Sequence, residues 1–152
     1  MNSTKLSILA LTSNHEKEWD FAKKLRQKNF FDPLSISDPF TSFFDHKEHV
    51  HLILCRDSEM VGYAHIQLWP EHRAALRILV IDEAYRNFGY GSEFLHLCEQ
   101  WLKERGVKSI HDESRPSSFK FYLKNGYVEM PFNDPSGEPP SPFDIAVGKI
   151  LN

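Results

Sequence analysis

The sequence predicts a single α/β domain built around a mixed sheet, and three observations lead to that fold class. The chain has 152 residues, of which 41% are hydrophobic and 26% charged, the composition of one ordinary globular domain. Apolar residues follow strand and helix periods in the order β-α-loop-β-β-β-α-β-α-β-β. No internal repeat, low-complexity tract or linker interrupts that order. Residues 1–152 are therefore expected to form one domain.

The N-terminal part is predicted to be a strand, a helix and an ordered loop. Residues 6–11 alternate in hydrophobicity as in a strand. A helix is predicted over about 16–28, with Ser13 or Asn14 as its N-cap and acidic residues near its positive end. The next segment, 30–45, holds five phenylalanines and two prolines without a long period. It is expected to be an ordered loop with one short helical turn.

Three strands joined by short turns are expected next, followed by the clearest helix of the chain. The strands are predicted at 50–55, 60–68 and 74–81. From Tyr90 the apolar residues change to a helical period that continues to about Arg105. Gly106 is suited to the left-handed position that often follows a helix.

The C-terminal part is expected to add one more helix and three more strands. A short strand is predicted at 107–110. Pro116 favours the start of a helix and Gly126 its end. Two further strands are predicted at 127–130 and 145–151. Between them, five prolines within 130–143 predict a long surface loop.

Charge and apolar content exclude several classes of protein. The formal net charge is −3, which leaves no global basic surface for a nucleic acid. No window approaches the ~20 apolar residues of a membrane span, and the apolar stretch at 6–11 is too short for a signal peptide. Cys55 and Cys98 lie in separate apolar runs, as buried thiols in a reducing compartment do. We therefore expect a cytoplasmic protein without a nucleic-acid or membrane partner.

The junction between strand and helix at 78–92 carries the strongest functional signal. An apolar strand runs into Arg-x-x-Gly-x-Gly and then into the clearest helix. Backbone amides at a helix N-terminus are unpaired and carry partial positive charge. Gly89 and Gly91 let the main chain approach an anion closely. Arg86 adds a cation and Ser92 a hydroxyl, so the junction predicts a pyrophosphate-binding turn.

Two better-known phosphate-binding motifs do not fit this junction. A dinucleotide fingerprint needs a third glycine where Phe94 stands, and a P-loop needs a lysine directly after Gly91. A glycine turn that serves packing alone stays an alternative. The histidines within 46–51 also suggest a metal site, but short clusters of this kind are usually solvated, and we expect no metal.

At this point the chain resembles the GCN5-related N-acetyltransferase (GNAT) superfamily. Residues 86–91, between an apolar strand and an amphipathic helix, resemble its acetyl-CoA motif. Residues 118–127 resemble its Phe-Tyr-x-x-x-Gly-Phe/Tyr segment, and their Tyr122 lies 31 positions after Gly91. Residues 144–151 are similar to its last strand. The resemblance covers nearly the whole chain and implies a mostly antiparallel sheet, splayed in its middle, with helices on both faces.

The resemblance implies acetyl-CoA as co-substrate and places it on particular residues. Backbone amides of the turn and of the helix start, together with Arg86, would hold the CoA pyrophosphate. The pantetheine arm would run beside the strand, where the Leu79 amide would polarise the thioester carbonyl. The implied cofactor-binding residues are Leu79, Val80, Ile81, Arg86, Asn87, Phe88, Gly89, Tyr90, Gly91 and Ser92.

The resemblance also implies acetyl transfer to a primary amine by direct attack in a ternary complex. Tyr122 matches the tyrosine that often acts as general acid toward the departing thiolate. A phenol pKa of ~10 keeps such a group protonated at neutral pH. The amine must also lose a proton. We predict Glu113 as the catalytic base, with His65 and His111 as alternatives.

The acceptor is left open by the sequence. Two branches of the family carry a basic group on the motif strand, at positions that here hold Ala75 and Arg77. A small metabolite amine, an aminoglycoside-like amine and a protein amine all remain candidates. The aromatic segment 30–44 is expected either to roof the acceptor site or to cover the core. Acidic residues available to attract an amine cation are Asp32, Asp38 and Asp45, with Asp134 and Glu138 on a further wall.

Two rival functions follow from the same residues. The first is a catalytically idle GNAT-like module that binds CoA as a regulator, because the motif strand lacks a base. The second is a nucleotide-binding or purely structural α/β domain. The sequence is also compatible with a homodimer.

Overall fold

The computed structural model describes residues 5–40, 46–137 and 139–152. Within these ranges the chain forms seven strands and three α-helices. The strands are β1 (Leu6–Ala10), β2 (His49–Arg56), β3 (Glu59–Trp69), β4 (Arg73–Ile81), β5 (Ser109–Ser114), β6 (Val128–Glu129) and β7 (Ile145–Ile150). The α-helices are α1 (Glu16–Arg26), α2 (Tyr90–Lys103) and α3 (Phe119–Lys124). Shorter helical turns occur at Gln27–Phe31, Asp32–Leu34, Glu83–Tyr85 and Pro116–Ser118.

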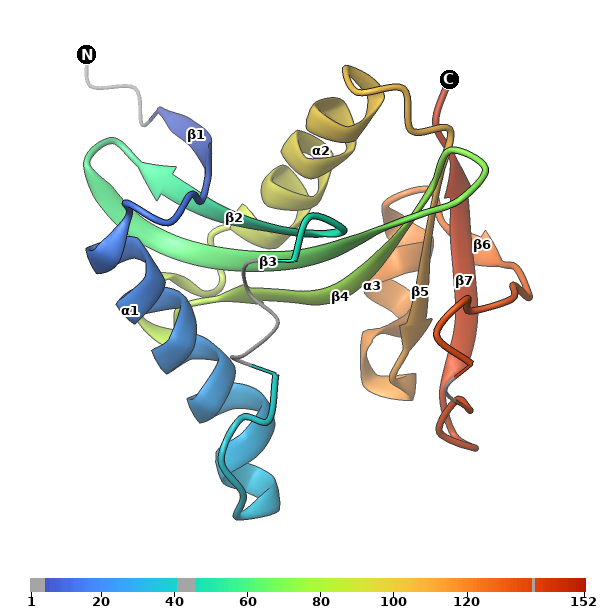
Figure 1. The fold of residues 1–152 in the computed structure, drawn as a ribbon, viewed down its shortest axis with the longest axis horizontal. Coiled ribbons are helices and arrows are strands. Elements are labelled where there is room, and N and C mark those ends of the chain that lie inside the picture. Colours follow the sequence, from blue (N-terminus) through green and yellow to red (C-terminus); the bar gives the residue numbers. More distant parts are fainter. Residues whose placement is uncertain (1–4, 41–45, 138) are drawn as a thin grey trace.

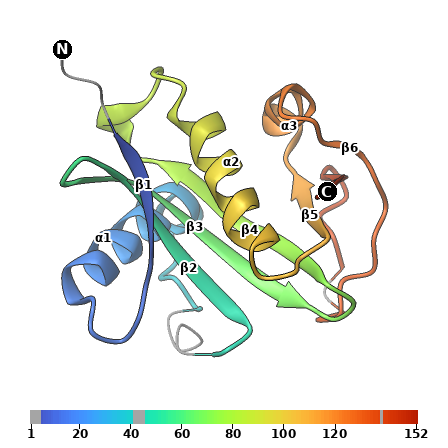
Figure 2. The same cartoon turned by 90° about the horizontal axis from the view of Figure 1, so that it is seen from above.

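The strands form one sheet in the order β1-β2-β3-β4-β5-β7-β6. Neighbouring strands are antiparallel except β4 and β5, which run parallel. Helix α1 covers one face of the sheet, and α2 and α3 cover the other (Figures 1 and 2). The prediction of a mixed, mostly antiparallel sheet with helices on both faces is therefore confirmed.

The two faces of the sheet bury two separate hydrophobic clusters. Strand alternation sends Leu52 and Leu54 of β2 into the cluster beneath α2, and Ile53 between them into the cluster beneath α1. Helix α2 contributes Phe94 and Leu95, both fully buried. Each cluster packs a helix against the same antiparallel strands, β1 to β4. Packing on both faces fixes the position of these strands and of their ends.

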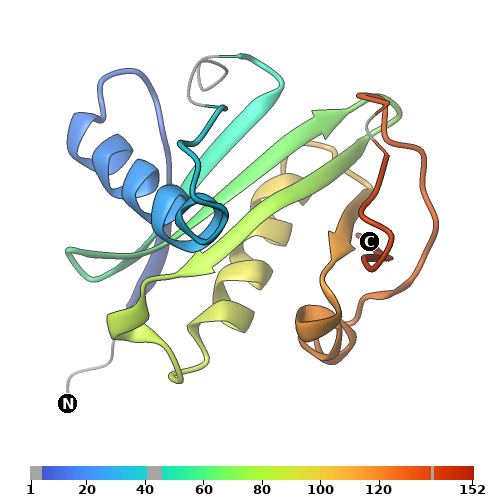
Figure 3. The ribbon, with the colours of Figure 1, turned by 90° about the horizontal axis from the view of Figure 1, so that it is seen from below.

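The sheet is splayed between β4 and β5. The two strands pair over only three residues, from Arg73 with Ser109 to Ala75 with His111. Beyond that point β4 continues along β3 as far as Ile81, while β5 continues along β7 as far as Ser114. Figure 3 shows the two strands diverging, with α2 beside β4 and α3 beside β5. One side of β4 is therefore left without a partner strand among the described residues.

Some predicted boundaries were wrong for identifiable physical reasons. The N-cap of α1 is His15 rather than Ser13 or Asn14, because a turn comes first in which the His15 N–H bonds to the Thr12 carbonyl. The helix also ends at Arg26 instead of Lys28 and widens into a π-helical turn.

The strand predicted at 107–110 instead runs from Ser109 to Ser114. Its pairing with β7 extends from Ser109–Ile150 to Ser114–Ile145, and a local pattern cannot show that a distant strand supplies these bonds. In the aromatic loop the structure shows a three-residue helical turn at Asp32–Leu34. Predictions for Phe43, Phe44, Asp45 and Glu138 lie outside the described residues.

Candidate active site

The turn between β4 and α2 presents unpaired backbone amides. Helix α2 begins at Tyr90, and Gly89 before it has φ of 79°, a left-handed conformation that favours glycine. At Gly91 a Cβ atom would lie 3.3 Å from the Phe121 ring of α3, so a larger residue would require that ring to shift by a few tenths of an ångström. The first amides of a helix have no partner within it. Residues 90–92 therefore offer their N–H groups to an anion.

Arg86 precedes this turn, and its side chain makes two hydrogen bonds. Its Nε donates a hydrogen bond to the Ile81 carbonyl oxygen at 3.0 Å, and its Nη2 donates to Asn29 Oδ1 at 2.8 Å. The side chain is exposed, and its other N–H groups have no partner among the described residues. The guanidinium is thus held between the end of β4 and Asn29, with N–H groups left to donate.

The remaining predicted cradle residues surround the start of α2. Asn87 has φ of 69° and forms the turn itself. Phe88 is 64% exposed, and its ring stacks on Tyr90 with centroids 5.7 Å apart. Ser92 Oγ accepts a hydrogen bond from Asn125 Nδ2 at 3.2 Å, which ties α2 to the end of α3.

Ladder geometry directs selected backbone groups of β4 into the splay. In an antiparallel pair only alternate residues exchange ladder bonds. The Asp82 N–H donates to the Val61 carbonyl at 2.8 Å, which identifies that pair as a bonded one. By alternation along the same register, the N–H and C=O groups of Leu79 and Ile81 point away from β3. Arg86 takes the Ile81 carbonyl, whereas the Leu79 groups face the opening where β5 has parted.

A cavity of about 370 Å³ occupies this opening. We call it the donor cavity. It is lined by the β4 segment from Arg77 to Val80, by Arg86, and by the side chains of Asp112, Ser118 and Tyr122. The Leu79 backbone and the predicted general acid thus face the same space.

Asp112 and Tyr122 interact with each other in the donor cavity. The Tyr122 hydroxyl donates a hydrogen bond to the Asp112 carboxyl. Burial, reinforced by that carboxyl, raises the pKa of Tyr122 above its usual value. Removal from water raises the pKa of Asp112 to about 7, although the hydrogen bond from Tyr122 opposes this change. A phenol that stays protonated therefore lies beside a carboxyl that changes charge near neutral pH.

The three bases proposed from the sequence lie elsewhere. Glu113 lines a smaller cavity of about 130 Å³ that does not include Tyr122, and burial raises its pKa. His111 shares a hydrogen bond with Ser109 Oγ at 2.8 Å. His65 has both ring nitrogens engaged, one with Arg26 and one with His49.

Sequence reasoning missed Asp112, the immediate neighbour of Glu113. The predicted strand ended at Ile110, so alternation was not followed to Asp112. With β5 extended to Ser114, Ile110, Asp112 and Ser114 share one side of the strand and Glu113 the other. An acidic residue interrupting the apolar alternation of a strand was the signal that pointed to it.

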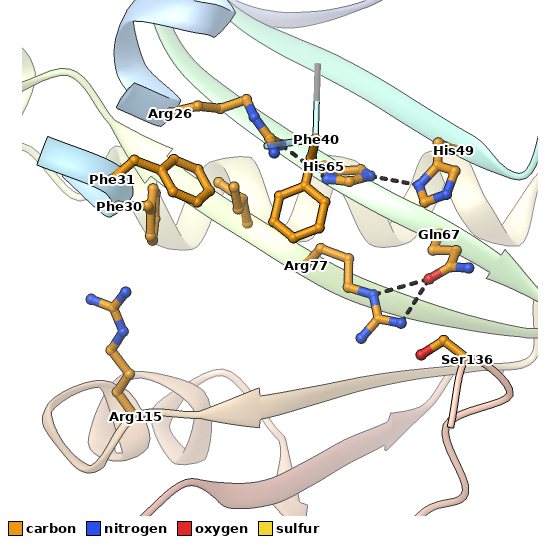
Figure 4. A pocket seen from close by; sticks show the side chains of 11 residues that line it. Arg26, Phe30, Phe31, Phe40, His49, His65, Gln67, Arg77, Arg115 and Ser136 are labelled. Carbon is orange, nitrogen blue, oxygen red and sulfur yellow. Dashed lines mark hydrogen bonds between the residues drawn. The ribbon is translucent and has the colours of Figure 1, made fainter. Parts of the chain in front are cut away.

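A second, larger cavity of about 530 Å³ adjoins the donor cavity. We call it the outer cavity. The two cavities share Phe30, Arg77, Ile78 and Arg115 as lining residues. Figure 4 shows the aromatic rings from the end of α1 and the loop after it on one side of the outer cavity, and Arg115 on the other. Part of the aromatic loop therefore does line a cavity next to the donor cavity.

A buried polar network forms the inner wall of the outer cavity. Arg26 is 1% exposed and pairs with Asp38, with Nε 2.6 Å from Oδ2. Its Nη1 donates to the Tyr63 hydroxyl and to His65 Nδ1, each at 3.1 Å. Asp38 is thus consumed by Arg26 rather than available to an amine cation. Asp32 is likewise engaged, because it accepts a hydrogen bond from Gln27 Nε2 at 2.7 Å.

Arginine fixes the direction of this network because a guanidinium can only donate. His65 Nδ1 accepts from Arg26, so His65 Nε2 carries the proton and donates to His49 Nδ1 at 2.8 Å. His49 in turn carries its proton on Nε2. Burial, reinforced by nearby cationic groups, lowers the pKa of both rings, so both stay neutral at physiological pH.

His51 is buried and lies on the same face of β2 as His49. From its burial we predict that the fold loses stability in acid. Its ring is 3% exposed, its Nδ1 lies 2.8 Å from the Tyr63 hydroxyl, and burial lowers its pKa to about 3. An unfolded histidine titrates near ~6.5, so this group's contribution is complete above that pH and declines as the pH falls toward 3. Between pH 7 and 5 wild type should lose about 2 kcal/mol more unfolding free energy than His51→Gln.

Urea denaturation of both proteins at the two pH values measures that difference. Asp112, whose raised pKa acts in the opposite direction, is present in both proteins and cancels. Equal losses in the two proteins would contradict the prediction.

The described residues contain neither a cluster suited to a metal ion nor a helix suited to span a membrane. In the described ranges no group of three His, Cys, Asp or Glu side chains is placed to hold a metal ion. No helix in this part of the chain is long and apolar enough to cross a bilayer.

Comparison with known proteins gives a consistent result. Residues 17–127 match the acetyltransferase (GNAT) family. A Bacillus subtilis (strain 168) protein, named as a candidate acetyltransferase, is 26% identical over 125 residues, which cover 80% of this chain and 83% of that protein.

Two solved structures share the fold at low sequence identity. Tetrahymena GCN5 superposes with a TM-score of 0.80 at 10% identity, covering 96% of each chain. An aminoglycoside 6′-N-acetyltransferase complexed with coenzyme A gives a TM-score of 0.76 at 16% identity, covering 96% of this chain and 97% of that one.

Proposed function

Since the chain belongs to the acetyltransferase (GNAT) family, we propose that it transfers an acetyl group from acetyl-CoA to a primary amine by direct attack in a ternary complex. The observation that carries this proposal is the splay, which leaves the Leu79 amide in the same cavity as Tyr122. A pyrophosphate-binding turn alone would suit many nucleotides. A site that combines this turn with an open strand edge and a protonated phenol is suited to a thioester.

The residues present fit acetyl-CoA along the length of the donor side. The α2 amides and the spare N–H groups of Arg86 suit the pyrophosphate, because both are donors that carry positive charge. The unpaired edge of β4 suits an extended arm that contains amide groups, since it offers alternating N–H and C=O groups. Bound acetyl-CoA supplies an activated acyl thioester at this point.

The chain's own residues handle charge and protons. The Leu79 N–H is directed toward the donor cavity, where it would donate to the carbonyl oxygen that gains negative charge. Tyr122, protonated at working pH, would donate its proton to the departing thiolate. Asp112, ionised above a pKa of about 7, would take a proton from the attacking amine. Because Asp112 contacts Tyr122, it can then return the proton to the phenol.

Glu113 stays a predicted alternative base. It lines the neighbouring small cavity together with Asp112. Asp112 has the stronger support because it also lines the cavity of Tyr122.

Acetyl-CoA binding and turnover test the proposal. We expect acetyl-CoA to raise the melting temperature of the folded protein, since a ligand at 100 times its Kd stabilises by about 2.7 kcal/mol. Gly89→Ala should weaken the Kd by about tenfold or more, because a side chain opposes the left-handed conformation that aims the α2 amides.

Gly106→Ala is the matched control. Gly106 also has a positive φ, 83°, and open space around it, but it follows the far end of α2. It should share the backbone strain and leave the Kd of acetyl-CoA unchanged. Failure of acetyl-CoA to bind the folded wild type would overturn the proposal. Binding without acetylation of any amine in a panel would instead favour the idle CoA-binding module.

A further inference from the structure

The outer cavity is the space next to the donor cavity, so its chemistry selects the acceptor. It opens between the end of α1, strands β3 and β4, and the chain that follows β5. Because Phe30, Arg77, Ile78 and Arg115 line both cavities, a molecule in the outer cavity can extend one end into the donor cavity. A volume of about 530 Å³ lies within the range of sites that bind small organic molecules.

Three arginines line the outer cavity, and two of them are neutralised within the protein. Arg26 is paired with Asp38. Arg77 donates to both oxygens of Asp134, at 3.0 and 3.2 Å, and to Gln67 Oε1. Among the described residues that line the cavity there is no aspartate or glutamate. The net fixed charge of the outer cavity therefore comes from the third arginine.

Arg115, the third arginine that lines the outer cavity, has no carboxylate partner among the described residues. Its guanidinium carbon lies 5.2 Å from the centroid of the Phe30 ring, and its side chain makes no hydrogen bond or ion pair with a described residue. Figure 4 shows the side chain reaching from the end of β5 toward Phe30. Its position places a bidentate donor at the junction of the two cavities.

His49 adds a second free donor to the same cavity. The network that starts at Arg26 leaves the proton of His49 on Nε2, and that N–H has no partner among the described residues. The ring is neutral, so it offers a hydrogen rather than a lone pair. The unpartnered polar groups of Arg115 and His49 are consequently both donors, and they call for an acceptor such as a carboxylate.

The other walls are apolar, and the single acid of the donor cavity is placed for an amine. Phe30, Phe31, Phe40 and Ile78 supply rings and an aliphatic side chain to the outer cavity. Among the described residues that line the donor cavity, Asp112 is the one carboxyl. Asp112 and Arg115 both line the donor cavity, and Arg115 also lines the outer cavity, so a carboxyl and a guanidinium border the same space.

We propose that the acceptor is a small amine that also bears a carboxylate and an apolar side chain, that is, a free amino acid of aromatic or aliphatic type. This inference rests on the proposed acetyl transfer. Arg115, with help from His49, holds the carboxylate, the phenylalanine rings hold the side chain, and the amine lies toward Asp112. A polycationic amine would meet an uncompensated guanidinium at the entrance of the donor cavity and is excluded.

Two pairs of acceptors that differ only in the carboxylate test the inference. L-phenylalanine is compared with 2-phenylethylamine, and L-leucine with 3-methylbutylamine, in steady-state acetylation by wild type, Arg115→Met and Arg105→Met. Wild type should prefer each amino acid in kcat/KM. Arg115→Met should raise the KM of the amino acids about tenfold to hundredfold and leave the simple amines unchanged. Comparing the same acceptors across variants removes the difference in their intrinsic amine reactivity.

Arg105→Met is the matched control, because Arg105 stacks on Trp101 at the far end of α2. The KM of acetyl-CoA should be the same in all three proteins. A rise in that KM in Arg115→Met would assign Arg115 to the donor and overturn the inference.

The remaining outcomes separate this inference from the proposed function. A kcat/KM of wild type for the simple amines, or for spermidine, as high as that for the amino acids would overturn the preference for a carboxylate while acetyl transfer stands. If acetyl-CoA does not bind wild type at all, the proposed function fails, and the acceptor inference fails with it.

Discussion

The Tyr122→Phe protein is expected to acetylate its acceptor about 10²–10⁴-fold more slowly in kcat, since that is the usual worth of a positioned general acid. The affinity for acetyl-CoA should change little, because the α2 turn and the β4 edge are untouched. Tyr122 is 7% exposed and its ring packs between Phe121 and Tyr127, so phenylalanine retains the packing and removes only the hydroxyl. A loss confined to kcat is the signature of a group that acts in the transition state.

Tyr127→Phe is the matched control for that substitution. The Tyr127 hydroxyl is also buried and donates to a carboxylate, Glu99, at 2.8 Å, but the residue lines neither the donor cavity nor the outer cavity. It should keep kcat close to that of wild type. If Tyr122→Phe and Tyr127→Phe lower kcat equally, the hydroxyl of Tyr122 has a structural role only.

The pH profile of the same reaction separates Asp112 from a structural partner of Tyr122. As a base, Asp112 must be ionised, so kcat/KM should fall as the pH drops through its pKa of about 7. Asp112→Asn should abolish the fall of kcat/KM at low pH and should lower the rate. Asp112→Glu should restore part of the rate and part of this pH dependence. A wild-type profile that follows only the pKa of the acceptor amine would contradict this role.

Arg26→Met is expected to destabilise the fold by about 3–5 kcal/mol, which is the usual cost of leaving one partner of a buried ion pair uncompensated. Arg26 and Asp38 have side chains 1% and 5% exposed. The substitution leaves the Asp38 carboxylate without its cation and the Tyr63 and His65 rings without their donor. Urea denaturation measures the loss as a shift of the midpoint at constant slope.

Lys28→Met is the matched control, since it removes an ion pair of similar length at the surface. The Lys28–Glu83 pair is 2.8 Å long, but its side chains are 60% and 68% exposed. Exposed pairs contribute little, so this variant should unfold at the same urea concentration as wild type within error. A loss in Arg26→Met no larger than in the control would show that the buried network is dispensable.

The fold and the glycine-containing turn between β4 and α2 were predictable because their sequence signals are local. The helical period of α2, the glycines at 89 and 91 and the meander of β2 to β4 each depend on a few consecutive residues. The role of Leu79 was expected from the family resemblance alone. The direction of its backbone groups follows from the register of β4 with β3, which only the structure gives.

The contact between Asp112 and Tyr122 and the buried network were not predictable, because their partners lie apart in the sequence. Arg26 meets His65 across 39 positions, and nothing in an amphipathic helix distinguishes a buried arginine from a solvated one. After Arg26 the helix widens into a π-helical turn over Gln27–Phe31. The side chains of this turn do not follow the regular period of an α-helix. Asp112 was missed because the length of β5 depends on β7, whose register is a tertiary property.

The polar wall of the outer cavity has an evolutionary consequence. Arg26, Asp38 and His65 hold the fold together and shape the cavity at once, so a substitution there alters both and carries a stability penalty. Arg115 is exposed, sits just beyond a strand end and has no side-chain partner in the described fold beyond a ring contact, so it is free to drift. Changes in acceptor preference among descendants of this protein should therefore accumulate at the loop arginine, while the histidine network is inherited unchanged.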